Sequence, residues 1–199
     1  LRKYTETLKL AGLKPSFYEI EVFSNIRATI ARSLAPVAII DLGAATSKLY
    51  LVELGIVLAS HVVSVGSQDI TRSLANTSHI SVTKAEEIKR QVGILTEVQN
   101  DSAVQVSHAA MLTMEHIFSE ARRVLLGFQK RYNKVITKVI LTGGGSTLKG
   151  LEDFAREQLD IEVEIAHPFA HVQAPAFLEE VLKDAGPDFA VALGLALRK

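Results

Sequence analysis

Cysteine and tryptophan are both absent from this sequence of 199 residues. Without cysteine the chain has no disulfide, no thiolate-bound zinc or iron–sulfur cluster and no thiol nucleophile, and its expected location is a reducing compartment, the cytoplasm. The 22 lysine and arginine residues balance the 22 aspartate and glutamate residues, so no uniform field attracts nucleic acid or an anionic membrane. We expect no nucleic-acid partner, and any site for a polyanion must be local.

Long apolar runs are absent as well. The longest, residues 34–40 and 189–197, are far shorter than the ~20 residues that a membrane-spanning helix needs, and no signal-peptide pattern precedes them. We therefore expect no direct membrane insertion. The length allows one large domain or two small ones, and with 48% hydrophobic residues the chain can bury a real core.

Three short apolar runs in the first third of the chain predict strands, at residues 37–40, 49–52 and 56–65. Parallel neighbours would need long crossovers, so these strands are expected to form an antiparallel meander. Three helices should follow. The first is expected to have Ser67 as its N-cap, and the second to begin at a capping box from Thr83 to Glu86. The third is expected to cover the long periodic stretch over 103–132.

The β pattern then returns, with a strand at 136–141, a glycine loop at 142–147, a helix at 151–159 and a strand at 161–165. Gly186 and Pro187 open a last helix, which is apolar nearly all round over 189–197 and is therefore expected to be buried. This order predicts an α/β fold, a mixed sheet flanked by helices with a helical insertion.

The first 35 residues do not fit that unit. They predict a helix over 4–11 that ends at Gly12, a short strand over 17–21 and a helix over 22–33. A lone strand–helix piece has no sheet of its own to join, and Leu1 falls inside an expected helix. We therefore expect these residues to be the tail of a preceding domain in a longer chain.

Residues 41–47, the turn between the first two strands, form the first candidate binding loop. Gly43 and Ala44 let the backbone approach a ligand, free N–H groups there can hold phosphate, and Thr46 and Ser47 add hydroxyl donors. Asp41 can hold a hydrated Mg²⁺ through water, as hard cations prefer. The alternative is a plain hairpin with an acidic turn residue.

Gly143, Gly144, Gly145 and Ser146 form the second candidate loop, between a strand and a helix. Three consecutive glycines cost conformational entropy, and a flat ligand such as adenine or ribose against bare backbone would explain that cost. The loop matches neither a Walker A motif nor the dinucleotide fingerprint. The alternative to a binding role is that this loop is only a flexible connection between the strand and the helix.

Glu86 and Lys89 lie three residues apart on one expected helix face. Together they can hold ribose hydroxyls and adenine, with glutamate as acceptor and lysine as donor or stacking stem. The alternative is that Glu86 completes the capping box and Lys89 is a solvated end of the helix. No catalytic residue can be named, because no catalytic triad or carboxylate pair is defined by spacing.

Taken in order, these segments resemble the C-terminal half of the bacterial actin-like ATPases of the PilM family, which serve type IV pilus assembly. Residues 41–47 resemble the second phosphate loop, 65–71 the G-G-x-x-x-T segment, 85–89 the A-E-x-x-K helix and 139–145 the adenosine motif. Residues 166–169 and 186–198 are similar to the PilM ending, which favours this family over FtsA, the related cell-division family. The fold is the ribonuclease-H-like lobe that actin, heat-shock chaperones and sugar kinases share.

The resemblance implies a domain division and a ligand. Residues 1–35 would end subdomain 1A, 36–73 and 135–199 would form subdomain 2A, and 74–134 would be the inserted 2B. ATP with Mg²⁺ would bind between this lobe and another. The first loop would face phosphate and metal, Glu86 and Lys89 the ribose and base, and the second loop the adenosine.

The resemblance also implies partners. The inner-membrane protein PilN would bind through its cytoplasmic peptide, in a groove that lies mostly outside this chain, and would keep the protein at the inner face of the cytoplasmic membrane. Other pilus assembly proteins and self-association are further expected contacts. ATP hydrolysis would be weak or absent in this chain. The alternatives are an FtsA-type division protein, a lobe of a sugar or small-molecule kinase, and an interaction module whose glycine loops bind nothing.

Overall fold

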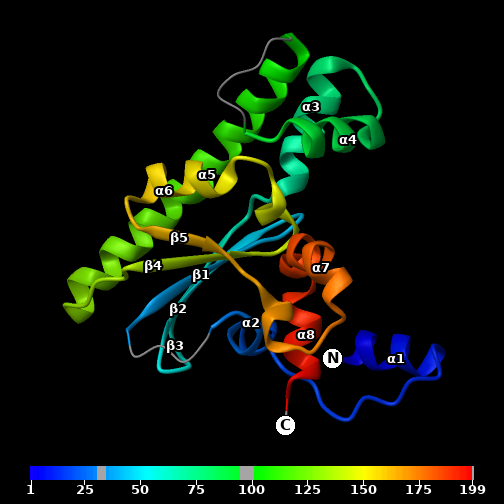
Figure 1. Cartoon of the computed structure of the whole chain (residues 1–199), viewed down its shortest axis with the longest axis vertical. Coiled ribbons are helices and arrows are strands. Elements are labelled where there is room, and N and C mark those ends of the chain that lie inside the picture. Colours follow the sequence, from blue (N-terminus) through cyan, green and yellow to red (C-terminus); the bar gives the residue numbers. More distant parts are fainter. Residues whose placement is uncertain (31–34, 95–100, 199) are drawn as a thin grey trace.

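The computed structural model describes residues 1–30, 35–94 and 101–198. Five strands form one mixed sheet in the order β3-β2-β1-β4-β5 (Figure 1). Their bounds are β1 Val37–Leu42, β2 Ser47–Glu53, β3 Ile56–Val63, β4 Lys138–Thr142 and β5 Glu162–Ile165. Among the described residues, the structure contains no helix that could span a membrane.

The pairing of the strands confirms the predicted meander. β2 lies antiparallel to both β1 and β3, whereas β4 lies parallel to β1 and to β5. The parallel pairs are the ones separated by helices, since only a long crossover can bring a strand back in the same direction. The sheet is therefore mixed, as the order of elements predicts.

The helices of the insertion are α3 Ser67–Ser78, α4 Val82–Val92 and α5 Asp101–Tyr132. Two predicted caps are wrong. Gly66, not Ser67, is the N-cap of α3, and its N–H donates to the Asp69 carboxylate at 2.9 Å. Ser81, not Thr83, caps α4 by accepting from the Lys84 N–H at 3.2 Å. Glu86 is thus free of any capping role.

The remaining helices are α1 Arg2–Leu10, α2 Glu21–Thr29, α6 Leu151–Leu159, α7 Glu179–Ala185 and α8 Ala190–Ala196. Four single turns of 3₁₀-helix accompany them, η1 Gly144–Thr147, η2 Pro168–His171, η3 Ala176–Leu178 and η4 Gly186–Phe189. The sequence predicts α6 to the residue and misses α7.

The predicted strand over 17–21 does not form. Residues 17–20 have no regular structure and α2 begins at Glu21, because no strand among the described residues lies beside this segment to pair with it. The helix predicted over 22–33 ends at Thr29, and residues 31–33 lie outside the described residues.

The last helix is less buried than predicted. Ala190 and Gly194 of α8 are buried against α2, but Phe189 is 50% exposed and Leu195 is 39% exposed. An all-round apolar pattern predicts burial only when neighbours surround the helix, and α8 has its main neighbour on one side.

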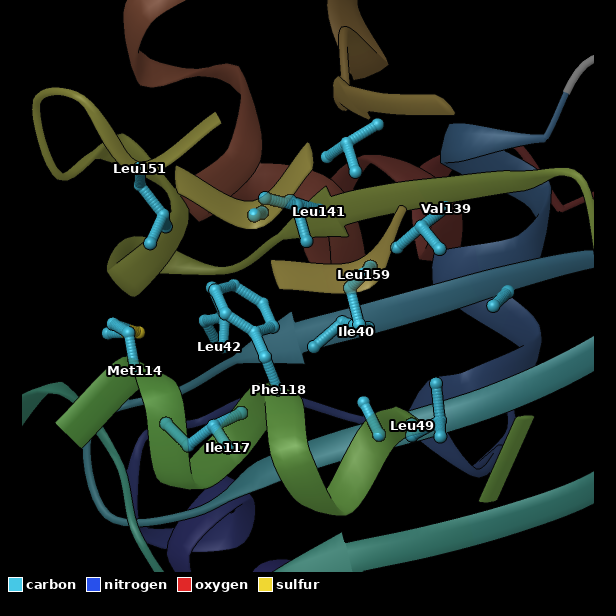
Figure 2. Close-up of a cluster of buried hydrophobic side chains, with 14 of the residues drawn as sticks. Ile40, Leu42, Leu49, Met114, Ile117, Phe118, Val139, Leu141, Leu151 and Leu159 are labelled. Atoms are coloured by element: carbon cyan, nitrogen blue, oxygen red, sulfur yellow. The ribbon is translucent and has the colours of Figure 1, made fainter. Parts of the chain in front are cut away.

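The core lies mainly between the sheet and α5 with α6. Figure 2 shows Ile117 and Phe118 of α5 facing Ile40 and Leu42 of β1, with Leu141 of β4 beside them. The alternate residues of β1, Val37 and Ile39, point to the opposite face and pack under α2, as the period of two in a strand requires. A separate small cluster holds α3, α4 and α5 together beyond the end of the sheet (Figure 1), formed by Leu74, Ala75, Ala85 and Val106.

Candidate functional site

A cleft of about 1000 Å³ lies where the first loop, the start of α3, the helix α4 and the second loop meet. Ala44, Gly144 and Gly145 from the two loops line it, together with Glu86 and Lys89 from α4. The fold thus brings together one part of each predicted motif, although the motifs are separated by tens of residues in the sequence. The remaining predicted residues, Asp41, Gly43, Thr46, Ser47, Gly143 and Ser146, do not line the cleft itself.

The first loop is fixed by its carbonyl groups. The Gly43 N–H donates to the Thr46 carbonyl at 3.1 Å, and the N–H groups of Ser67 and Gln68 donate to the carbonyls of Gly43 and Ala44, each at 2.9 Å. The N–H groups of residues 44–46 make no hydrogen bond within the described chain. Three consecutive N–H groups are therefore available to an anion.

Gly66 allows this contact between the loop and α3. A Cβ atom at position 66 would lie 2.4 Å from the Ala44 carbonyl oxygen and 2.7 Å from that of Gly43. Only glycine lets the start of α3 approach the loop backbone so closely.

The hydroxyl groups of two predicted site residues, Ser47 and Ser146, are used elsewhere. The Ser47 hydroxyl donates to the Val65 carbonyl at 2.9 Å, and the Ser146 hydroxyl donates to the Gly143 carbonyl at 2.7 Å. Both serines are buried. Their hydroxyls hold the loops in shape and do not face the cleft.

Asp41 lies at the end of β1, behind the two loops. Its Oδ2 accepts a hydrogen bond from the Asn25 Nδ2 at 3.1 Å, and a Cβ atom at Gly143 would lie 2.4 Å from its Oδ1. Burial raises the pKa of Asp41, while the Lys48 ammonium and the Asn25 hydrogen bond oppose that rise. The described residues contain no group of three histidine, cysteine or acidic side chains that could hold a metal.

Glu86 and Lys89 form a bonded pair on the cleft wall. Lys89 Nζ lies 2.8 Å from Glu86 Oε2, the Thr71 hydroxyl donates to the same oxygen at 2.6 Å, and Arg90 Nε donates to Oε1 at 3.0 Å. Burial alone would raise the pKa of Glu86, but the hydrogen bonds from Lys89, Thr71 and Arg90 outweigh it and lower the pKa to about 2.

Lys89 is buried rather than solvated. Its side chain is 7% exposed, and its ammonium also donates to the Ser67 carbonyl at 3.3 Å. The alternative reading of this pair, a capping box and a solvated helix end, is therefore wrong.

The second loop is ordered by its own contacts. The Gly143 N–H and the Thr142 hydroxyl both donate to the Pro187 carbonyl, at 3.1 and 3.3 Å, and residues 144–147 form the turn η1. A Cβ at Gly145 would meet Leu42 at 2.8 Å, and one at Gly144 would meet Asp188 at 2.6 Å. Close packing against the Leu42 backbone thus accounts for Gly143 and Gly145, whereas the neighbour of Gly144 is the end of a flexible side chain.

Sequence reasoning missed three residues of this region. Thr71, which binds Glu86, ends the G-G-x-x-x-T-like segment, so a signal was present. Asp188, which lines the cleft, follows Gly186 and Pro187 with no further signal. Asn25 is a single asparagine within a helix and belongs to no sequence motif, so only the folded structure places it against Asp41.

Comparison with known proteins gives a family and a fold. The family model described as "Type IV pilus assembly protein PilM" matches residues 2–199. Among solved structures, a PilM–PilN type IV pilus biogenesis complex is similar with a TM-score of 0.84 and 28% identity, over 99% of this chain and 56% of that one.

Two further structures are similar in fold alone. The ethanolamine utilization protein EutJ from Carboxydothermus hydrogenoformans has a TM-score of 0.69 and 19% identity, over 98% of this chain and 59% of that one. MreB 5 of Spiroplasma citri, bound to AMPPNP, has a TM-score of 0.69 and 15% identity, over 98% of this chain and 63% of that one. The chain thus spans less than two thirds of the length of each of these relatives.

Proposed function

This chain belongs to the family of the type IV pilus assembly protein PilM, and from that premise we propose that it acts in an actin-like scaffold of pilus assembly that binds ATP with Mg²⁺ in the cleft. The observation that supports ATP binding is that Ala44, the first of three consecutive residues whose N–H groups are unpaired, lines one cleft together with the Glu86–Lys89 pair and the second loop. The volume of this cleft lies within the range of small-molecule sites.

The phosphates would bind the first loop. Consecutive backbone N–H groups that point outward form an anion site without any lysine or arginine, which suits a chain of zero net charge. Mg²⁺ would be held by phosphate oxygens and by water on Asp41, since it prefers oxygen ligands and keeps several of its waters. The cation would offset the phosphate charge.

The nucleoside would lie between α4 and the second loop. Glu86 is ionised near neutral pH, because its pKa is about 2, and so it can accept a hydrogen bond from a ribose hydroxyl. Its bond to Arg90 is the one a sugar would replace, since the Arg90 side chain is 77% exposed. Lys89 would stay in place, because it is buried and bonded to the Ser67 carbonyl.

Residues 36–73 and 135–199 would form the sheet subdomain, and residues 74–134 would be the insertion. In support, α3 and α4 lie beyond the end of the sheet (Figure 1) and have a cluster of buried side chains of their own. Residues 1–35 would belong to a preceding subdomain, although α2 packs on this lobe.

A PilN-type protein is the proposed partner. The support is the solved complex of PilM with PilN, of whose matched chain the present one covers 56%. We place the peptide groove mostly outside this chain, and the protein at the inner face of the cytoplasmic membrane through that partner. Self-association and contacts with other assembly proteins complete the proposal, and an FtsA-type role is disfavoured by the family match.

Calorimetric titration with ATP, with and without Mg²⁺, tests the proposed ligand. It is made on the 199-residue chain and on the longest chain that the gene encodes around it. We expect tight binding by the longer chain and weak binding by the shorter one, with little hydrolysis. Gly144→Arg should abolish binding, because its side chain would enter the cleft.

Gly127→Arg is the matched control, because a Cβ at Gly127 meets nothing within 4 Å and the residue lies on α5 away from the cleft. Equal binding by the Gly144→Arg protein and the wild type would refute the nucleotide site. Phosphate transfer to a sugar would favour the kinase alternative instead.

A further inference from the structure

Asn25 has an unusual environment on α2. Its residue surface is 1% exposed, and its Nδ2 donates to Asp41 Oδ2 at 3.1 Å. Its Oδ1 is the one buried side-chain oxygen or nitrogen without a hydrogen-bond partner in the described part of the chain. An acceptor that is taken out of water and left unpaired costs free energy, so such atoms in native proteins call for an explanation.

The hydrogen bond to Asp41 fixes the direction of the Asn25 amide. The Asn25 Nδ2 donates to Asp41 Oδ2, so the amide turns its NH₂ group to the Asp41 carboxyl. The amide oxygen lies on the same small planar group and is therefore held beside the same carboxylate. Asn25 thus leaves an acceptor, not a donor, next to Asp41.

Other oxygen atoms gather at the same place. Glu21 lies one helical turn before Asn25 on α2 and therefore on the same helix face. Its carboxylate pairs with the Lys48 ammonium and accepts from the Tyr50 hydroxyl at 3.3 Å. Lys48 is also the partner of Asp41 across the β1–β2 register. An acceptor, two carboxylates and one ammonium therefore face each other between α2 and the sheet.

We infer that Asn25 is a positioning residue, which holds Asp41 Oδ2 with its NH₂ group and accepts, on Oδ1, a hydrogen bond from a water of a hydrated divalent cation at Asp41. Metal sites commonly depend on such outer partners, which orient the carboxylate and bind the waters of the ion. A separate buried water would offer the same donor, so the experiment must distinguish the two sources. Only the cation part rests on the proposed function.

The first test uses Mn²⁺ alone, without nucleotide, as a paramagnetic probe of the whole 199-residue chain. Amide signals of residues 43–46 should broaden as Mn²⁺ is added, and Asp41→Asn should abolish the effect. Asn25→Leu, which keeps the side-chain size but removes both polar atoms, should raise the Mn²⁺ concentration for half-broadening by about tenfold. Thr29→Val is the matched control, because Thr29 is buried one turn further along α2 and, among the described residues, its hydroxyl bonds only the Asn25 backbone carbonyl.

Equal Mn²⁺ concentrations for Asn25→Leu and wild type would overturn the inference. So would a wild-type chain without broadening, in which case the donor is a separate buried water. If broadening behaves as expected but ATP does not bind, the proposed function fails while the role of Asn25 stands.

The second test needs no metal. The pKa of the Asp41 carboxyl, followed by carbon NMR, should rise in Asn25→Leu, since the carboxylate loses a donor, and should not change in Thr29→Val. An unchanged Asp41 pKa in Asn25→Leu would show that Asn25 does not position this carboxylate. Asn25→Ser, whose hydroxyl is too short to reach Asp41, repeats both tests if the leucine variant does not fold.

Discussion

Glu86 accepts hydrogen bonds from three donors, so its negative charge stabilises the folded state. Its pKa is about 2 in the folded protein, against an ordinary value of 4.5. Because the folded-state pKa is lowered, the stabilisation is complete above pH 4.5 and is lost as the pH falls toward 2. Glu86→Gln should therefore reduce the free energy of unfolding by roughly 1 kcal/mol near neutral pH, a modest value because solvent screens the partly exposed side chain.

Denaturant unfolding from neutral pH down to about pH 2.5 measures this effect, and the gap between wild type and Glu86→Gln should close on the way down. Glu87→Gln is the control, because Glu87 is exposed and pairs with Lys84 alone among the described residues. Curves for Glu86→Gln that run parallel to those of wild type would contradict the assignment.

Asp41 has the opposite linkage, because burial raises its pKa. The folded state then binds its proton more tightly than the unfolded chain, so the stability of wild type falls as the pH rises above the ordinary value of 3.8. Asp41→Asn removes the buried charge, and its new amide can donate to Asn25 Oδ1. We expect a gain of about 1 kcal/mol at neutral pH, largest there and smaller near pH 4, in the same denaturant experiment. A loss of stability at neutral pH would be the contrary result.

The loops illustrate which residue roles the sequence can predict. Spacing places Glu86 and Lys89 on one helix face, and the structure puts them together on the cleft wall. Sequence spacing does not reveal that the hydroxyls of Ser47 and Ser146 point into the protein, because a serine hydroxyl can donate equally well to any nearby carbonyl. The role of Asn25 depends wholly on a contact across 16 positions of the chain.

At the scale of elements, the strands and helices with the strongest periodic patterns were predicted correctly. The meander β1–β3 and the helix α6 follow from alternation and from helical spacing, which are local properties. Two wrong predictions concern properties that depend on neighbouring elements in the folded structure. Residues 17–20 carry a strand pattern but have no strand to pair with, and α8 is apolar all round but is covered mainly on one side.

Gly66 joins two elements, the first loop and α3, and this contact can be broken by one methyl group. Gly66→Ala would place a Cβ atom 2.4 Å from the Ala44 carbonyl oxygen, and since this neighbour is backbone, either the loop or the helix must shift. We expect a loss of about 1–3 kcal/mol in the free energy of unfolding. Gly127→Ala, a helical position with nothing within 4 Å, should instead gain roughly 0.5–1 kcal/mol.

Thermal and denaturant unfolding of both alanine variants measure these changes. If Gly66→Ala were as stable as wild type, the close approach of α3 to the loop would not be required. The amide spectrum of residues 43–46 should change in the same variant, because the bonds from Ser67 and Gln68 hold that loop.

At the scale of the whole molecule, the two distant helices α2 and α8 lie side by side under the sheet (Figure 1). A Cβ atom at Gly194 of α8 would lie 1.9 Å from the Ser24 carbonyl oxygen of α2, so the two backbones are in direct contact. Arg27 adds a bond to the Gly194 carbonyl and an ion pair with Glu19 at 2.9 Å. This contact sets the position of α2, and α2 carries Asn25 to Asp41.

Gly194→Ala should therefore act at a distance. The added methyl group has no room and must push α2 away from α8, which should cost about 1–3 kcal/mol of stability and loosen the bond between Asn25 and Asp41. Hydrogen exchange of the α2 amides should become faster, and the pKa of Asp41 should rise, as is also expected for Asn25→Leu. Ala192→Gly, also on α8 but at an exposed position, is the control that weakens the helix without crowding α2. Should the two variants change the Asp41 pKa equally, or not at all, α8 would have no part in placing Asn25, and the link from the C-terminal helix to the candidate site would be absent.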